Sequence, residues 1–169
     1  MSQIILGNHS YSASNPVLAG VMSNVIVGKY CSIASGVIFD CGWNHRNDCV
    51  STYPFNKMWN MDNDTHPYTN GDIIIENDVW IGQEAVVKSG VKIHNGAIVG
   101  FRSVVTRDVP AYAIVAGIPA KVIRYRFTKK QINNLLKIKW WDWHEHIVRE
   151  HVFDLMSNNI DEFLKNNLR

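Results

Sequence analysis

Residues 75–110 read IENDVW IGQEAV VKSGVK IHNGAI VGFRSV VTRDVP, and this stretch repeats every six residues. A branched apolar residue opens each hexad, and a small or β-branched residue follows four positions later. The opening residues are Ile75, Ile81, Val87, Ile93, Val99 and Val105, and the second set is Val79, Ala85, Val91, Ala97, Ser103 and Val109. A helical pattern would drift relative to this period, and a plain strand would alternate every two residues. The period of six instead indicates a β-helix, in which three hexads form one triangular coil.

The same period occurs nearer the N-terminus and is then interrupted. Its expected interior positions are Val21, Val27, Ile33 and Phe39, with Val25, Cys31 and Val37 as their partners, and Leu6 to Tyr11 is a candidate for an earlier coil. The period stops after Phe39 and resumes after Gly71. The intervening segment, about 41–70, is long, aromatic and polar, and a loop of this size within a compact repeat is uncommon unless it has a function. We expect it to form an excursion loop that encloses a cleft beside the coils.

The last part of the chain changes to a helical pattern. Thr128 and Gln131 have the spacing of a capping box, and an apolar stripe follows them. Further helices are expected at about 144–156 and 160–168. Three tryptophans, Trp140, Trp141 and Trp143, are expected to anchor this part on the coils rather than to form a ligand cage. The predicted organisation is a β-helix domain over 1–127 and a helical appendage over 128–169 that caps the coils or packs on a neighbouring subunit. The fold class is therefore all-β with C-terminal helices.

Composition excludes several functional classes. The chain has 169 residues and a net charge of +2, which gives no argument for nucleic acid or a membrane surface. No apolar run is long enough to span a membrane, and no signal peptide is recognisable. The three cysteines lack the spacing of a disulfide framework or a zinc site. We expect a reduced, cytoplasmic protein without a metal.

Five segments carry a family resemblance. They are CGWNHRNDCVSTYPF (41–55), DVWIG (78–82), VVTRDV (104–109), GIPAKVIR (117–124) and IKWWDW (138–143). Together, over about residues 21–146, they resemble the hexapeptide-repeat acyltransferases and, within them, the xenobiotic acetyltransferase branch. That branch includes streptogramin and hexapeptide-type chloramphenicol acetyltransferases and enzymes that acetylate sugars of surface polysaccharides. The resemblance implies a left-handed parallel β-helix that works as a homotrimer. It also implies three sites between subunits, each closed by one excursion loop, with acetyl-CoA lying along the coils.

His45 is the candidate catalytic residue. Acyl transfer to an unactivated hydroxyl needs a base that removes its proton, and histidine suits this at neutral pH. His45 lies where the coils give way to the loop, and the resemblance assigns the same role to it. His66 is expected to be an ordinary solvated loop residue. A thiolate mechanism using Cys41 or Cys49 is the alternative, although the family uses direct attack without a covalent step.

The remaining candidates are binding residues. A backbone N–H near Gly82 or in the next coil is a candidate donor to the oxyanion of the transition state. Trp80 is expected to wall the cofactor or the acceptor, and basic side chains suit the phosphates of CoA. The candidates for acceptor binding are Trp43, Asn44, Tyr53 and Trp80, and those for cofactor binding are Trp80, Gly82, Phe101, Thr106, Arg107, Lys121 and Arg124.

The leading prediction is an acetyl-CoA-dependent O-acetyltransferase that modifies a sugar hydroxyl, in a surface-polysaccharide precursor. The alternative is an antibiotic O-acetyltransferase acting on a streptogramin or on chloramphenicol. The sugar is preferred because drug-modifying members usually have a small residue in place of Trp43 and an asparagine in place of Cys41. A sugar N-acetyltransferase and a non-catalytic trimeric scaffold are further alternatives.

Overall fold

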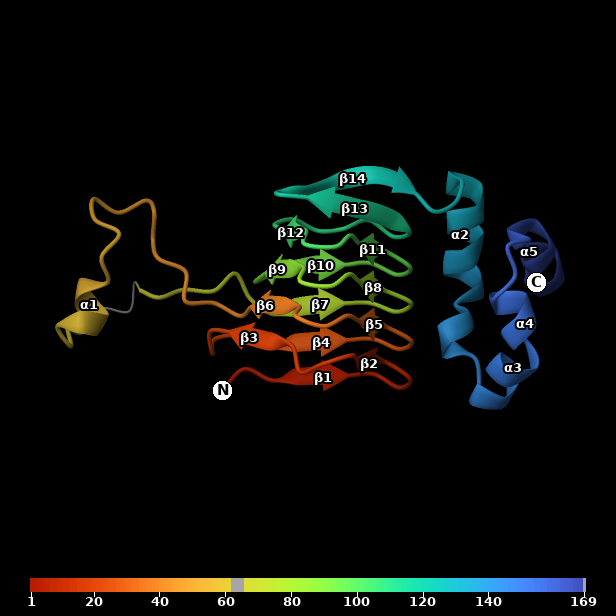
Figure 1. The fold of residues 1–169 in the computed structure, drawn as a ribbon, viewed down its shortest axis with the longest axis horizontal. Helices are drawn as coiled ribbons and strands as arrows, with labels where there is room; N and C mark the ends of the chain where they lie inside the picture. The colour runs from red at the N-terminus through yellow and green to blue at the C-terminus, as the bar shows by residue number, and fades with distance from the viewer. Residues whose placement is uncertain (62–65, 169) are drawn as a thin grey trace.

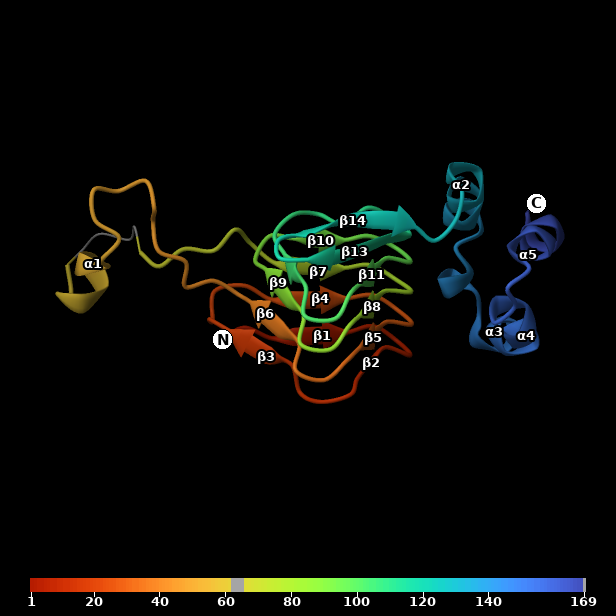
Figure 2. The ribbon, with the colours of Figure 1, turned by 45° about the horizontal axis from the view of Figure 1, so that its top comes forward.

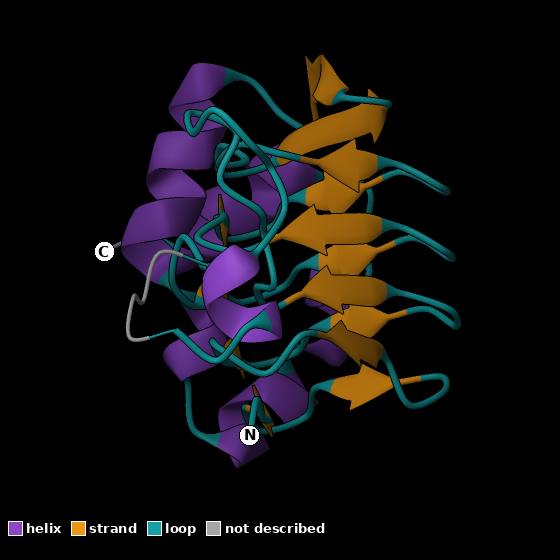
Figure 3. Ribbon diagram, turned by 90° about the vertical axis from the view of Figure 1, so that its left-hand side faces the viewer, coloured by secondary structure: helices purple, strands orange, loops and turns teal. Residues whose placement is uncertain are grey.

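The computed structural model describes residues 1–61 and 66–168, in which short parallel strands wind into a triangular prism (Figure 1). The strands of the coils are β1 (Ile4–Leu6), β2 (Tyr11–Ser12), β3 (Val17–Ala19), β4 (Val25–Val27), β5 (Ser32–Ile33), β6 (Ile38–Asp40), β7 (Ile73–Ile75), β8 (Trp80–Ile81), β9 (Val86–Lys88), β10 (Lys92–Ile93), β11 (Ile98–Val99) and β12 (Val104–Val105). Each coil contributes one strand to each of three sheets, ordered β1-β4-β7-β10, β2-β5-β8-β11 and β3-β6-β9-β12. Figure 3 shows the strand arrows stacked one above another, coil upon coil.

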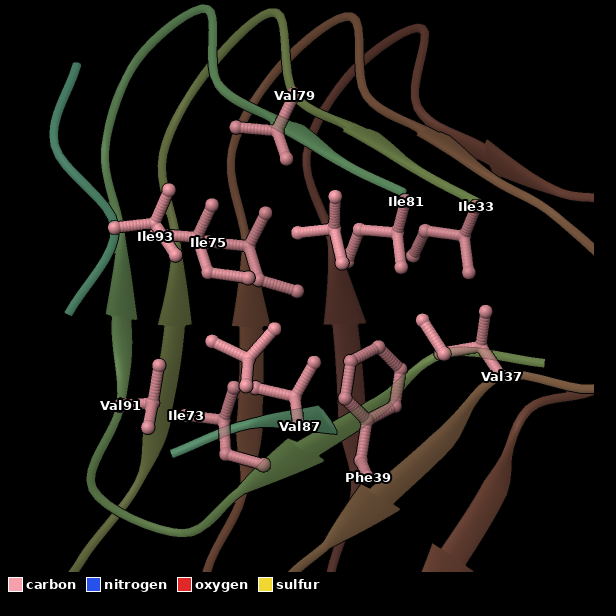
Figure 4. Packing of buried hydrophobic residues seen from close by; sticks show 14 of the residues in the cluster. Ile33, Val37, Phe39, Ile73, Ile75, Val79, Ile81, Val87, Val91 and Ile93 are labelled. Carbon is pink, nitrogen blue, oxygen red and sulfur yellow. The ribbon is translucent and has the colours of Figure 1, made fainter. Parts of the chain in front are cut away.

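The hexad residues fill the prism. From Val27 to Val105 every predicted opening residue is at most 3% exposed, and the second set is buried as well. Figure 4 shows Ile33 and Ile81, and likewise Ile75 and Ile93, pointing inward from adjacent coils. A fully buried branched side chain of this kind stabilises the fold by about 1.5–3 kcal/mol. The period of six therefore places the opening residue of one hexad, facing inward, on each side of the triangle.

Val21 was predicted to be interior, and this prediction is wrong, because its side chain is 56% exposed. In the regular coils six residues separate Val86 from Lys92, which occupy equivalent positions in neighbouring sheets. Nine residues separate Val17 from Ile26, which occupy the same two positions two coils earlier. The three additional residues break the phase of the repeat, so Val21 falls in a bend outside the prism. The first coil also begins earlier than expected, at β1.

Strand register measures the size of the excursion loop. Partners within the later coils are 18 residues apart, as for Val86 and Val104, whereas Ile38 and Val86 are 48 apart across the loop. The insertion is therefore 30 residues long. It leaves the prism after β6 and returns at β7, and its described residues include the short helix α1 (Phe55–Met58).

The corner of the prism that holds Asp78 places one residue per coil in the left-handed region of backbone space. Asp78 and Gly96, which are 18 residues apart, both have positive φ values (55° and 69°). Glycine is required at position 96, because a Cβ atom there would lie 2.4 Å from the ring of Tyr112.

The coils end in an antiparallel hairpin, β13 (Ala113–Gly117) and β14 (Ala120–Tyr125), and the helical appendage follows. It comprises α2 (Lys129–Ile138), a 3₁₀ turn (Trp140–Asp142), α3 (Glu145–Glu150), α4 (Val152–Leu155) and α5 (Ile160–Asn167). The capping box of Thr128 and Gln131 is confirmed. The helix expected at 144–156 is instead two helices that meet at His151.

The helices lie along one corner of the prism rather than across its end (Figures 1 and 2). Tyr30 and Tyr112, from corner turns of two coils, belong to the apolar cluster that holds them. The Trp140 ring lies 4.9 Å from that of Tyr30, and Trp141 is buried. These two tryptophans are the anchors that the sequence predicts, whereas Trp143 packs within the appendage against Phe163.

A partly buried ion pair lies at the same corner. The guanidinium of Arg126 donates to Asp78 at 3.1 Å and to the carbonyl of Gly96 at 2.8 Å, and it lies over the Tyr112 and Phe127 rings. Burial raises the pKa of the Asp78 carboxyl above its ordinary value, although Arg126 opposes this effect. The segment leading to α2 is thus joined to the coils by charge as well as by apolar contact.

Within the described residues, the longest helices are too short and too polar to cross a bilayer.

Candidate active site

The excursion loop starts from a base where its two legs pair. Asn44 N–H donates to Tyr68 O at 3.0 Å, and Tyr68 N–H donates to Asn44 O at 2.9 Å. The side chain of Asn44 accepts from Lys88 Nζ at 3.0 Å and donates to Ser89 Oγ at 3.3 Å, and Lys88 also contacts Asp40. Asn44 was a candidate for acceptor binding, but in this chain both ends of its amide tie the loop to the next coil.

His45 follows directly, on the exposed side of the loop. Its Nδ1 lies 2.8 Å from the carbonyl oxygen of Thr52. A carbonyl oxygen can only accept, so Nδ1 carries the proton and Nε2 keeps its lone pair. A hydrogen bond of this kind selects the tautomer and orients the ring. The arrangement can therefore accept a proton at Nε2.

His66 is not the solvated residue that the sequence suggested, because it is only 6% exposed. Its Nδ1 accepts a hydrogen bond from Arg46 N–H at 3.1 Å. Its ring meets that of His45 edge-on, with 5.8 Å between centroids. Sequence analysis missed this contact, since the two histidines are 21 positions apart and share no motif.

Aromatic side chains cover the far part of the loop. The Phe55 ring lies 4.8 Å from that of Tyr53 and 4.7 Å from that of Trp59. A concave surface of about 320 Å³ is lined by Cys49, Val50, Ser51, Tyr53, Phe55, Asn56, Met61 and His66. Tyr53 was a candidate acceptor residue, whereas Phe55 and Trp59 were not. Trp43, the other loop candidate, is exposed and has a positive φ of 69°.

The Trp80 side chain lies on the outer face of the second sheet and is 54% exposed. Strand register places Trp80 beside Ile98, Ile98 beside Ile114, and Ile114 beside Arg124. With strands spaced by about 4.8 Å, this row runs for about 14 Å along the prism. It thus joins an aromatic side chain to a cationic one on β14, where the candidate Lys121 also lies.

Gly82, Phe101, Thr106 and Arg107 lie at corners of the prism. A Cβ on Gly82 would lie 2.8 Å from the Phe101 nitrogen, so only glycine fits between these coils. Phe101 is exposed beneath the guanidinium of Arg102. Thr106 and Arg107 follow β12, at the corner from which the loop departs two coils away.

One chain does not bring His45 and Trp80 together. The loop extends away from the prism on the side opposite the helices, whereas β8 lies nearer to them (Figures 1 and 2). The predicted site residues thus form two groups, His45 with the loop and Trp80 with Arg124. Among residues 1–61 and 66–168, no cluster of three or more His, Cys, Asp or Glu side chains is placed to hold a metal ion.

The surroundings of the two loop cysteines test the alternative thiolate mechanism. Cys41 is fully buried, and burial raises the pKa of its thiol, which disfavours the reactive thiolate. Cys49 is exposed on the loop. We expect Cys41→Ser and Cys49→Ser to retain most of the wild-type turnover, measured as release of free CoA thiol. A loss in either variant as large as that of His45→Ala would restore the thiolate mechanism.

Comparison with known proteins shows which family this chain belongs to. The family described as bacterial transferase hexapeptide (six repeats) matches residues 72–107. A chloramphenicol acetyltransferase from Klebsiella aerogenes is 42% identical over 146 residues, which are 82% of this chain and 69% of that enzyme. The chain belongs to the hexapeptide-repeat acetyltransferases. A second relative of this hexapeptide-repeat acetyltransferase is the chloramphenicol acetyltransferase of Agrobacterium fabrum, which is 46% identical over 125 residues. That alignment covers 70% of this chain and 60% of the relative, so the chain spans less than two thirds of it.

Solved structures of the family include the polySia-specific acetyltransferase NeuO. It is 28% identical to this hexapeptide-repeat acetyltransferase, with a TM-score of 0.56 over 76% of this chain and 56% of NeuO. The two curated relatives are thus named for chloramphenicol, whereas NeuO is described as specific for polySia.

Proposed function

We propose that this acetyltransferase transfers the acetyl group of acetyl-CoA to a hydroxyl of a small xenobiotic with an apolar, aromatic part, as an antibiotic acetyltransferase does. The observation that carries the proposal is its similarity, above 40% identity, to two chloramphenicol acetyltransferases. The loop also supports it, because the concave surface beside His66 is lined largely by apolar and aromatic side chains. The sugar acceptor preferred from the sequence has weaker support from these relatives.

The proposed reaction is a direct attack. The acceptor hydroxyl gives its proton to His45 Nε2 while its oxygen bonds to the thioester carbonyl carbon. The oxyanion then collapses, the carbon–sulfur bond breaks, and the leaving CoA thiolate takes the proton from Nε2. Thr52 O keeps the proton of Nδ1 in place throughout, so that Nε2 performs both transfers. No covalent enzyme intermediate is needed.

Acetyl-CoA is proposed to lie along the row from Trp80 to Arg124. Trp80 would contact the pantetheine near the reacting thioester, and Lys121 and Arg124 would meet the phosphates about 14 Å away. Gly82, Phe101, Thr106 and Arg107 remain candidates at the neighbouring corners, and a backbone N–H near Gly82 remains the candidate oxyanion donor.

We further propose a homotrimer of left-handed coils in which the loop of one subunit reaches the cofactor face of the next. One chain leaves His45 and Trp80 apart, and a second chain could bring the two groups together. The first sheet also presents an outward row of exposed apolar side chains, Ile5, Ile26 and Ile74, of a kind that marks contact surfaces. Light scattering is expected to give three times the 19.2 kDa of one chain. A monomer at working concentration would contradict the shared site.

The acceptor class is tested by a substrate screen. Acetyl-CoA is combined with chloramphenicol, streptogramins and a panel of sugars, and thiol release is followed. We expect kcat/KM for one antibiotic to exceed that for every sugar by about tenfold or more, because apolar contacts with the loop contribute to binding. Mass spectrometry of the product identifies the acetylated oxygen.

A sugar hydroxyl is the second candidate, favoured by the likeness to NeuO and by exposed aromatic rings such as Tyr53 and Trp59. A sugar turned over more efficiently than every antibiotic in the same screen would select this candidate.

A further inference from the structure

We propose that the buried His66 is a positioning residue that holds the peptide following His45 and thereby keeps the His45 ring in its reactive place. This inference rests on the proposed role of His45 as general base.

The peptide groups on both sides of His45 are fixed to the returning leg of the loop. Before it, Asn44 and Tyr68 exchange two backbone hydrogen bonds of 3.0 and 2.9 Å. After it, Arg46 N–H donates to His66 Nδ1 at 3.1 Å. The first link uses backbone atoms alone and tolerates many side chains. The second link depends on the side chain at position 66.

His66 is itself held firmly enough to act as a clamp. Its side chain is buried, and its carbonyl oxygen accepts from Asn56 Nδ2 at 2.9 Å. Because Nδ1 accepts from an N–H group, that nitrogen carries no proton, and the neutral ring keeps its proton on Nε2. The ring also contacts His45 edge-on, at 5.8 Å between centroids. His66 therefore restrains both the backbone and the ring of the catalytic residue.

The remaining restraint on His45 is not sufficient alone. Thr52 O fixes the rotation of the ring through Nδ1, but the position of the ring also depends on the backbone that carries it. A displacement of about 1 Å in a catalytic group can cost about 10²-fold in rate. Without the acceptor at position 66, Arg46 N–H loses its partner and the His45 peptide is held on one side only.

Two substitutions distinguish the effect of the hydrogen bond to Arg46 N–H from the effect of side-chain volume at position 66. His66→Leu removes the acceptor at similar volume, whereas His66→Asn places an amide oxygen where Nδ1 stood. We expect His66→Leu to lower kcat about 10- to 100-fold with KM for acetyl-CoA within about twofold of wild type, since the cofactor face is untouched. His66→Asn is expected to recover kcat to within about fivefold of wild type.

His94→Leu is the matched control, because His94 also uses Nδ1 in a contact, with Glu76 at 3.3 Å, but lies on the coils away from the loop. It should keep wild-type kcat. A His66→Leu enzyme with unchanged kcat, or a folded His66→Asn enzyme as slow as His66→Leu, would overturn the inference. His45→Ala is assayed in parallel. If His45→Ala stays fully active, His45 is not the catalytic base. If His45→Ala loses activity while His66→Leu keeps wild-type kcat, only the positioning role of His66 is refuted.

Discussion

His45→Ala is expected to lower kcat/KM by about 10²- to 10⁴-fold, the range typical of a lost general base. The effect should fall on kcat, because His45 lies on the loop, whereas the proposed cofactor row lies on the second sheet. Thermal unfolding should be close to that of wild type, since the exposed ring contributes little burial. The measurement is steady-state thiol release, with KM for acetyl-CoA determined separately.

His45→Gln is the informative companion. Glutamine can hydrogen-bond but cannot accept a proton at neutral pH, so it should be as inactive as His45→Ala. If His45→Gln retains near-wild-type kcat, then the side chain only orients the acceptor, and the proton must leave by another route.

Arg126→Met is expected to lower the free energy of unfolding by about 2–4 kcal/mol at neutral pH. Breaking a buried ion pair typically costs about 3–5 kcal/mol, and the estimate is reduced because the side chains of Arg126 and Asp78 are 28% and 27% exposed. Methionine retains apolar packing beside Tyr112 but leaves the Asp78 carboxylate without its partner. Denaturant midpoints at one fixed protein concentration measure the change.

The loss of stability in Arg126→Met should depend on pH, and the direction of this dependence follows from the pKa of Asp78. Burial raises the pKa of Asp78 in the folded chain, and loss of Arg126 removes a factor that lowers it. An acid whose pKa is higher when folded binds more protons in the native state, so stability falls as pH rises through the folded pKa. The deficit of Arg126→Met should therefore be largest at neutral pH and shrink as pH falls towards 3.8, the ordinary value. Adding Asp78→Asn should remove this pH dependence, and a deficit that is constant with pH would contradict the account.

The prediction of the coils from sequence succeeded where the repeat is regular. Val27, Ile81 and Val99 are buried as predicted, because each hexad specifies its own inward side chain through local backbone geometry. The prediction failed at Val21, because three additional residues between Val17 and Ile26 shift the phase of the repeat. The regular period begins only after these residues, so the sequence pattern does not reveal them.

The candidate site was predictable only in part. A motif identified His45, but its partners come from positions that no local pattern links to it. Thr52 and His66 reach it because the loop turns back on itself. Asn44 lies beside it in sequence, and yet its amide is committed to Lys88 and Ser89 on the next coil.

The amino-acid sequence alone thus determined the prism and the length of its interruption, and it singled out His45 as the candidate base, because these features repeat or are carried within a few neighbouring residues. Only the tertiary structure decided that the helices lie along a corner, that His66 is buried against His45, and that Trp80 shares a row with Arg124. These relations depend on the register between coils and on the path by which a loop returns. Both are set by long-range packing and hydrogen bonding, which sequence spacing does not record.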